Sequence, residues 1–425
     1  MLYLDYAKRR YEAAIKEIER LEQSEFPYTH IRDVLLQLKT LFAKQLAYLN
    51  KPTEKSSADI AKNACSQSLT YLFRYSPFLG FILHATNVRN SFELYAPLLR
   101  LAHRLLEPTT KLILSSEWEY SPFVYLPTSD LPGCVLIGIP ALESANPLLV
   151  SLAGHELGHN IWNVRNLESK FENALRDEVV KVIKTKFMKE FKEYCPSAND
   201  DDLASNMFAI NAWLPALTYA KRQLEEVFCD IMGLQLFAEA YLHSFAYLLS
   251  PCLPGRRTPF YPTTHARAKY MSDVAASMDV SVPTGYNDLF DTQDLPSSYG
   301  MDIFDTQNSS SSHGMDILVR IADTVVDANV DAMKKEVQSF AASKEIPKRS
   351  HENVNKIASD FRKIIPTDDS QPLTDVINAG WILFHDKELW KNMPQIKAGD
   401  RQRILCDLIL KSCEVGEFRE RVNSQ

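Results

Sequence analysis

Apolar residues recur at helical spacing over most of the chain, beginning within residues 3–22. Two rows of side chains there repeat every seven residues: Leu4, Tyr11 and Ile18, and beside them Ala7, Ala14 and Leu21. A second amphipathic pattern covers residues 29–49 and ends at Asn50 and Pro52, because proline breaks helical hydrogen bonding. We predict that residues 1–52 form a helical hairpin, which either packs on the rest of the chain or mediates self-association.

The apolar pattern changes character between residues 111 and 139. Three short runs rich in apolar residues, 111–114, 122–125 and 134–139, are separated by turn residues, which predicts β-strands. They would form a small sheet directly before a helix that begins near Pro147. The edge of this sheet either binds an extended peptide by strand addition or only supports the helix.

A tandem duplication interrupts the helical pattern later in the chain, because Phe290-Asp-Thr-Gln recurs as Phe304-Asp-Thr-Gln in a polar, serine-rich stretch. Such a stretch is typical of an exposed loop. We predict an α+β fold that is predominantly α-helical. Its regions are a helical hairpin (1–52), a helical region (53–110), a core with the small sheet (111–285), a tandem-repeat surface loop (286–317) and a C-terminal helical region (318–425).

Composition and charge exclude several classes of function. The 425-residue chain has a net charge of −7 and no evident basic face, which argues against nucleic acid as the main partner. No apolar run reaches the roughly 18 residues that a membrane span needs, and the N-terminus lacks a signal-peptide layout. The seven cysteines are scattered without a C-x-x-C pair, which indicates reduced thiols. We therefore expect a cytoplasmic protein without a membrane partner.

The strongest chemical signal is the stretch His155-Glu156-Leu-Gly-His159. Side chains four residues apart share one face of a helix, so His155 and His159 can bind a single metal ion. Glu156 would lie near the open side of that metal and take a proton from a metal-bound water. This pattern is the helix signature of zinc-dependent hydrolysis. The alternative is an ordinary buried helix that carries two structural histidines.

A catalytic zinc usually has three protein ligands, and the best candidate for the third is Glu226. This residue precedes Asp230 by four positions in an otherwise apolar stretch, where a carboxylate needs a partner. Asp230 can then accept the free ring N–H of a ligand histidine. Glu225 competes with Glu226, and the spacing to Asp230 favours Glu226. We expect the neighbouring Cys229 to be a small buried hydrophobe.

At these residues the chain resembles the gluzincins, the zinc metallopeptidases defined by His-Glu-x-x-His and a later Glu-x-x-x-Asp. The long gap between His159 and Glu226 is nearest in layout to the branch of the CAAX prenyl endopeptidases and the bacterial heat-shock membrane peptidase. Those proteins carry transmembrane helices, which this sequence does not predict. The resemblance covers about residues 135–269 and implies a zincin-like catalytic core.

The resemblance also implies roles for individual residues. The implied ligands of Zn²⁺ are His155, His159 and Glu226. The resemblance makes Glu156 the general base and Asp230 the residue that orients His155.

A donor to the developing oxyanion is expected downstream, in the stretch that runs from Tyr261 to Tyr270. His265 or Tyr261 can serve as this donor beside the zinc, while Arg267 is expected to pair with a carboxylate. The alternative for His265 is an exposed histidine at the start of a helix.

We predict a zinc-dependent metallopeptidase that hydrolyses a peptide or protein substrate through a zinc-bound water activated by Glu156. Two other readings stay open. The zincin-like core can be a non-catalytic scaffold or regulatory interaction protein, or the zinc site can hydrolyse a non-peptide amide.

Overall fold

The computed structural model describes residues 2–24, 26, 30–51, 58–85, 92–117, 123–125, 131, 133–140, 143, 145–199, 201–250, 258–290, 309–391 and 393–423. The chain divides into two compact units, Met1–Pro147 with Cys413–Gln425, and Leu148–Ser412. The described part is mostly helical with one small sheet, which confirms the predominantly α-helical α+β class. Among the described helices, none combines the length and apolar composition that crossing a bilayer requires.

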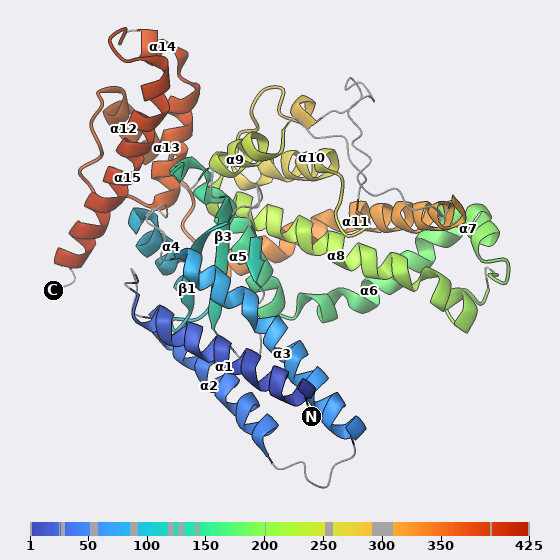
Figure 1. Cartoon of the computed structure of the whole chain (residues 1–425). Helices are drawn as coiled ribbons and strands as arrows, with labels where there is room; N and C mark the ends of the chain where they lie inside the picture. Colours follow the sequence, from blue (N-terminus) through green and yellow to red (C-terminus); the bar gives the residue numbers. More distant parts are fainter. Residues whose placement is uncertain are drawn as a thin grey trace. The chain divides into compact units, whose positions relative to one another are not determined.

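The first unit begins with three helices that pack on one another, α1 (Leu2–Glu22), α2 (His30–Asn50) and α3 (Ala58–Ala85) (Figure 1). A fourth helix, α4 (Phe92–Leu105), contacts the first strand of the sheet. The predicted hairpin is confirmed, and its apolar rows are buried in a core shared with α3, where the Tyr11 ring meets Phe42 edge-on at 5.7 Å. The hairpin thus packs within its own unit, and self-association stays a prediction.

The sheet of the first unit has the strand order β1-β3-β2. Its strands are β1 (Lys111–Glu117), β2 (Phe123–Tyr125) and β3 (Cys134–Pro140), so the three predicted strands are confirmed. β1 runs parallel to β3 with Lys111 opposite Cys134, and β2 runs antiparallel to β3 with Tyr125 opposite Leu136. β3 is the central strand and is apolar and almost wholly buried, as expected of a strand covered on both faces. Peptide binding at the sheet edge stays a prediction.

The second unit is built around α5 (Ala153–Val164) and the long helix α8 (Met207–Phe237), which lie side by side (Figure 1). The helix start predicted near Pro147 is a 3-10 turn, η2 (Pro147–Leu152), and the α-helix begins only at Ala153. Asn206 caps α8, because its side chain accepts hydrogen bonds from the backbone N–H groups of Phe208 and Ala209.

Further helices surround this pair. Alongside α8 and the long helix α11 (Ser309–Ser343) lie α6 (Leu167–Val182), a π-helical turn η3 (Ile183–Phe187) and α7 (Met188–Tyr194). The remaining elements are α9 (Glu239–Leu249), α10 (Thr264–Ala275), η4 (Ala276–Met278), η5 (Asn287–Phe290), α12 (His351–Arg362), α13 (Leu373–His385), α14 (Lys387–Lys391) and α15 (Ala398–Asn423).

Two glycines allow α5 and α8 to touch through their backbones. A Cβ atom on Gly158 would lie 2.9 Å from the Cα of Cys229, and one on Gly154 would lie 3.0 Å from the Cα of Gly233. These separations are too short for a side chain, so only glycine permits the contact. The helix propensity lost at the two positions, about 1 kcal/mol each, is thus the cost of a close helix–helix approach.

The structure differs from the predicted regions in two places. Residues 309–317, predicted as the end of the surface loop, form the first turns of α11, where Ile317 and Leu318 are buried. Helical packing of these apolar residues replaces the loop there, while residues 291–308 of the duplication lie outside the described part. The two units also cut across the predicted core 111–285, because the sheet falls in the first unit and α5 in the second.

Candidate metal centre

The two histidines of α5 both face one carboxylate of α8. His155 Nε2 lies 3.4 Å from Glu226 Oε2, and His159 Nε2 lies 3.6 Å from Glu226 Oε1. The helical spacing of His155 and His159 places their rings on one face, at a centroid separation of 4.9 Å. The structure therefore brings together the three residues that the sequence proposes as ligands.

The separations between these atoms fit a tetrahedral zinc site. Ligand atoms at about 2.0–2.1 Å from a tetrahedral Zn²⁺ are about 3.4 Å apart. Each histidine Nε2 lies near this distance from Glu226, His155 from Oε2 and His159 from Oε1. Two imidazole nitrogens and one carboxylate oxygen also form a donor set typical of a catalytic zinc that keeps one position open. The residues present thus fit this metal.

The opposite nitrogens of both rings are held by acids of α8. His155 Nδ1 is 3.0 Å from Asp230 Oδ1, and His159 Nδ1 is 2.9 Å from Glu225 Oε1. An Nδ1–H donated to a carboxylate leaves the lone pair of Nε2 on the side of Glu226, as a metal ligand requires. Asp230 lies beside His155 as predicted, whereas Glu225, considered only as a rival ligand, is instead the partner of His159.

Asp230 lies at the centre of a buried network. Arg267 donates from Nε to Oδ2 and from Nη2 to Oδ1, both at 2.7 Å, and the Tyr241 hydroxyl donates to Oδ1 at 2.7 Å. Burial disfavours the charged carboxylate, yet the Arg267 guanidinium and the His155 ring hold the pKa of Asp230 well below its usual range. The prediction that Arg267 pairs with a carboxylate is confirmed.

Burial and neighbouring charges have opposing effects on the pKa values of the site residues. Burial opposes protonation of His155, but its hydrogen bonds to Asp230 and Glu226 outweigh burial and raise its pKa to about 10. Without a metal the ring is therefore protonated at both nitrogens, and a zinc ion bound at Nε2 would displace that proton. Burial raises the pKa of Glu156, which is 5% exposed and whose carboxylate has no hydrogen-bond partner within the described part of the chain. A carboxylate with a raised pKa beside two ligand candidates is suited to proton transfer near neutral pH.

Cys229 offers a rival third ligand. One potential ligand atom from each of His155, His159 and Cys229 lies within 4.8 Å of the others. Burial, together with nearby carboxylates including Glu226, raises the pKa of the Cys229 thiol well above its ordinary value, and zinc binds the thiolate. This cluster of mutually close ligand atoms does not include Glu226. We prefer Glu226 because each of its oxygens lies near one of the two Nε2 atoms.

The two candidates for the oxyanion donor have different surroundings. The pKa of Tyr261 is raised by the negative charge of Glu226, then by burial, and also by Glu156, so its hydroxyl lies within electrostatic reach of the site. Its side chain is 49% exposed. His265 is exposed at the first turn of α10, and none of the contacts found within the described residues joins it to the other site residues.

Sequence reasoning missed Tyr241 and considered Glu225 only as a ligand. Tyr241 comes from α9, and its ring packs where a Cβ on Gly233 would be 2.5 Å away; no spacing rule connects it to α5. Glu225 had a usable signal, since it directly precedes Glu226 in a buried stretch. Arg222 Nη1 also donates to Glu225 at 3.1 Å, one helical turn earlier.

Comparisons of the whole chain with family models, curated proteins and solved structures found no match.

Proposed function

We propose that this chain is a zinc-dependent metallopeptidase of gluzincin type, with a zincin-like core. One observation carries the proposal: both oxygens of Glu226 face the Nε2 atoms of His155 and His159, while acids hold both Nδ1 atoms. A structural ion pair would explain one such contact. In a metal site, the Nε2 atom of each histidine points at the metal and its Nδ1 atom is held by a hydrogen bond.

The chain's own residues account for the proton transfers of hydrolysis. A zinc ion held by His155, His159 and Glu226 would act as a Lewis acid toward the scissile carbonyl. Glu156 then accepts the proton of the attacking water and passes it to the leaving amine. Of the two candidate donors to the oxyanion we prefer Tyr261, because the charge of Glu226 raises its pKa.

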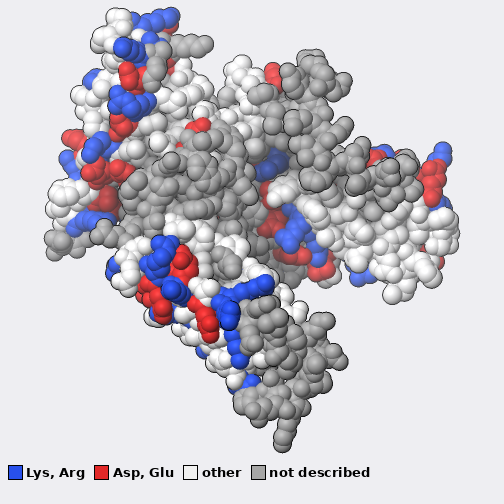
Figure 2. All heavy atoms as spheres, viewed as in Figure 1, with Lys and Arg blue, Asp and Glu red and all other residues white. Residues whose placement is uncertain are grey.

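The surface charge supports a peptide or protein substrate rather than nucleic acid. Figure 2 shows Lys and Arg beside Asp and Glu on the described parts of the face in view, and the chain's net charge is −7. Nucleic-acid binding is favoured instead by surfaces of one positive sign. We also propose a cytoplasmic location.

Zinc content per chain tests the ligand set. We expect about one zinc in the wild type and in Cys229→Ser, and clear loss in Glu226→Ala. Zinc that survives Glu226→Ala but is lost in Cys229→Ser would assign the third ligand to Cys229. A folded wild type that takes up no supplied zinc would leave His155 and His159 as structural histidines, and the enzyme proposal would fail.

Hydrolysis of a peptide library tests the chemistry. Glu156→Gln should retain zinc and lose nearly all activity, whereas Glu168→Gln, an exposed glutamate on α6, should behave as the wild type. Full activity in Glu156→Gln would contradict the mechanism. A zinc-loaded wild type that cleaves no peptide would favour the scaffold reading or, if it hydrolyses small amides, the non-peptide reading.

A further inference from the structure

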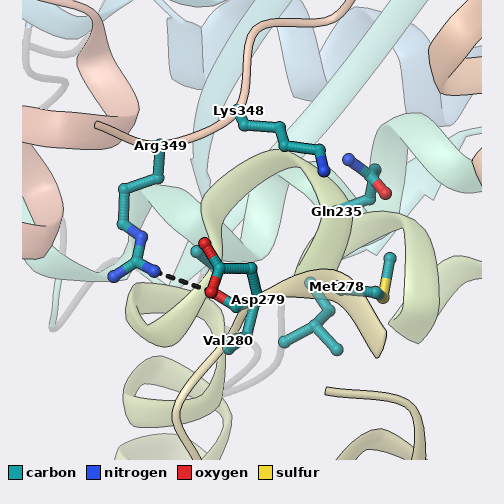
Figure 3. A pocket seen from close by; sticks show the side chains of 8 residues that line it. Gln235, Met278, Asp279, Val280, Lys348 and Arg349 are labelled. Atoms are coloured by element: carbon teal, nitrogen blue, oxygen red, sulfur yellow. Dashed lines mark hydrogen bonds between the residues drawn. The ribbon is translucent and has the colours of Figure 1, made fainter. Parts of the chain in front are cut away.

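Two cavities of the second unit differ in what they can hold. The smaller, about 20 Å³, lies beside Asp279, Lys348 and Arg349 (Figure 3). Arg349 Nη2 donates to the backbone carbonyl of Asp279 at 2.8 Å, and Arg349 Nη1 pairs with Glu239 at 2.8 Å. This volume holds one water at most, and Arg349 is already paired, so the smaller cavity has only a structural use.

The larger cavity has a volume of about 560 Å³, within the range of small-molecule sites. Residues of α9, α13 and the segment 283–289 line it: His243, Ala246, Tyr247, Ser250, Pro283, Thr284, Tyr286, Leu289, Trp381, Ile382, Phe384 and His385. None of the candidate metal-centre residues is among them. The cavity is therefore distinct from the site described above.

The wall of this cavity is aromatic. The Trp381 ring stacks on His243 at 5.2 Å and on His385 at 5.7 Å, and it meets Phe384 edge-on at 5.0 Å. Tyr247 packs edge-on against the Trp381 ring at 6.2 Å. Such a cluster presents ring faces and edges that favour another planar aromatic group.

A histidine pair gives the cavity its polarity. His385 Nε2 lies 3.2 Å from His243 Nδ1, and burial lowers the pKa of both rings, that of His243 to about 4. Both rings are therefore neutral at pH 7. A neutral imidazole has one donor and one acceptor nitrogen. The outer nitrogens, Nε2 of His243 and Nδ1 of His385, are those not used in the contact between the two rings. Whichever ring donates in that contact, one outer nitrogen is a donor and the other is an acceptor.

The lining also limits the charge of the ligand. None of the residues that line the cavity in the described part of the chain is Asp, Glu, Lys or Arg, so nothing there compensates a charged ligand.

We propose that this cavity binds a small, uncharged, planar aromatic molecule whose polar group both donates and accepts a hydrogen bond, as a carboxamide does. The aromatic wall holds the ring, and the outer nitrogens of His243 and His385 match the two functions of the polar group. The inference is independent of the proposed peptidase activity, because it uses none of the metal-centre residues.

The test is a calorimetric titration of the full chain with benzamide. Benzoate, which carries a charge, and cyclohexanecarboxamide, which lacks the aromatic ring, serve as comparison ligands. We expect saturable binding of benzamide and at least tenfold weaker binding of both comparison ligands. Absence of saturable benzamide binding, or equal binding of benzoate, would overturn the proposal.

Matched variants test whether benzamide binds in this cavity. His385→Leu, on the exposed rim, and Ala246→Leu, which fills the cavity, should each weaken benzamide binding at least tenfold. His351→Leu, an exposed histidine outside the cavity, should leave it unchanged. Benzamide affinity that is equal in the wild type and both cavity variants would place the binding elsewhere and overturn the assignment.

Discussion

Asp230 and Arg267 form a bidentate ion pair in which each carboxylate oxygen accepts one guanidinium N–H at 2.7 Å. Oδ1 of Asp230 also lies 3.0 Å from Nδ1 of His155, so Arg267 helps to orient a candidate metal ligand that it does not touch through a hydrogen bond. The pair joins α8 to α10. It therefore links the stability of the second unit to the geometry of the candidate site.

Removal of Arg267 should be strongly destabilising. Arg267→Leu leaves Asp230 buried without its countercharge, and breaking a buried pair costs about 3–5 kcal/mol. Urea unfolding should show this loss in the free energy of unfolding. Lys269→Leu, which breaks the exposed pair with Asp273 on the same helix, should change stability little; equal losses in both variants would show that the Asp230–Arg267 pair has no special role.

Glu225 should control zinc affinity without being a ligand. Glu225→Gln weakens the acceptor that orients His159, and loss of such a partner typically reduces metal affinity 10- to 100-fold. Competition with a chromophoric chelator measures this change. Glu172→Gln on α6, where the glutamate pairs with Lys221 at the surface, is the control, and unchanged affinity in Glu225→Gln would remove Glu225 from the site.

Two Gly→Ala substitutions should change the stability of the fold in opposite directions. Gly158→Ala forces a Cβ to 2.9 Å from the Cα of Cys229, which should separate α5 from α8 and cost about 1–3 kcal/mol. Gly80→Ala in α3 meets nothing within 4 Å, so its better helix propensity should stabilise by up to about 1 kcal/mol. Thermal unfolding of the two variants distinguishes them, and a neutral Gly158→Ala would refute the close helix contact.

Acid should weaken the fold through His243. Its pKa in the folded chain is about 4, below the ordinary 6.5, so the unfolded chain binds the proton first as the pH falls. The contribution of neutral His243 to the free energy of unfolding is fully present above pH 6.5 and is lost as the pH falls to 4. Between pH 7 and pH 5 this contribution decreases by about 2 kcal/mol. The difference in unfolding free energy between the wild type and His243→Phe should fall by this amount. A difference that is independent of pH would contradict the lowered pKa.

Much of the candidate site follows from helical periodicity. His155 and His159 share a face because they are four residues apart, and the same spacing joins Glu226 to Asp230. Two helices with complementary faces leave few ways to pack, so the four residues meet in the structure as the sequence predicts. The three strands were also predictable, because short apolar runs between turn residues have few other conformations.

Tertiary contacts account for what sequence reasoning missed. Tyr241 reaches Asp230 only because Gly233 leaves room for its ring, a relation between α8 and α9 that no local pattern encodes. Helix α8 also continues through Pro215, a residue that disfavours helix interiors, to Phe237. Packing of the helix interior against α6 and α11 outweighs the local preference.

The adjacent acids Glu225 and Glu226 hold the two nitrogens of one ring, since Nδ1 of His159 meets Glu225 and Nε2 meets Glu226. Successive residues of a helix diverge by about 100°, so the two side chains approach the imidazole from different directions. The adjacent acids are visible in the sequence, and the structure shows what each of them contacts. Chains in which an acidic residue directly precedes the glutamate of Glu-x-x-x-Asp, downstream of His-Glu-x-x-His, are expected to immobilise their second histidine in the same way, even where whole-chain similarity is lost.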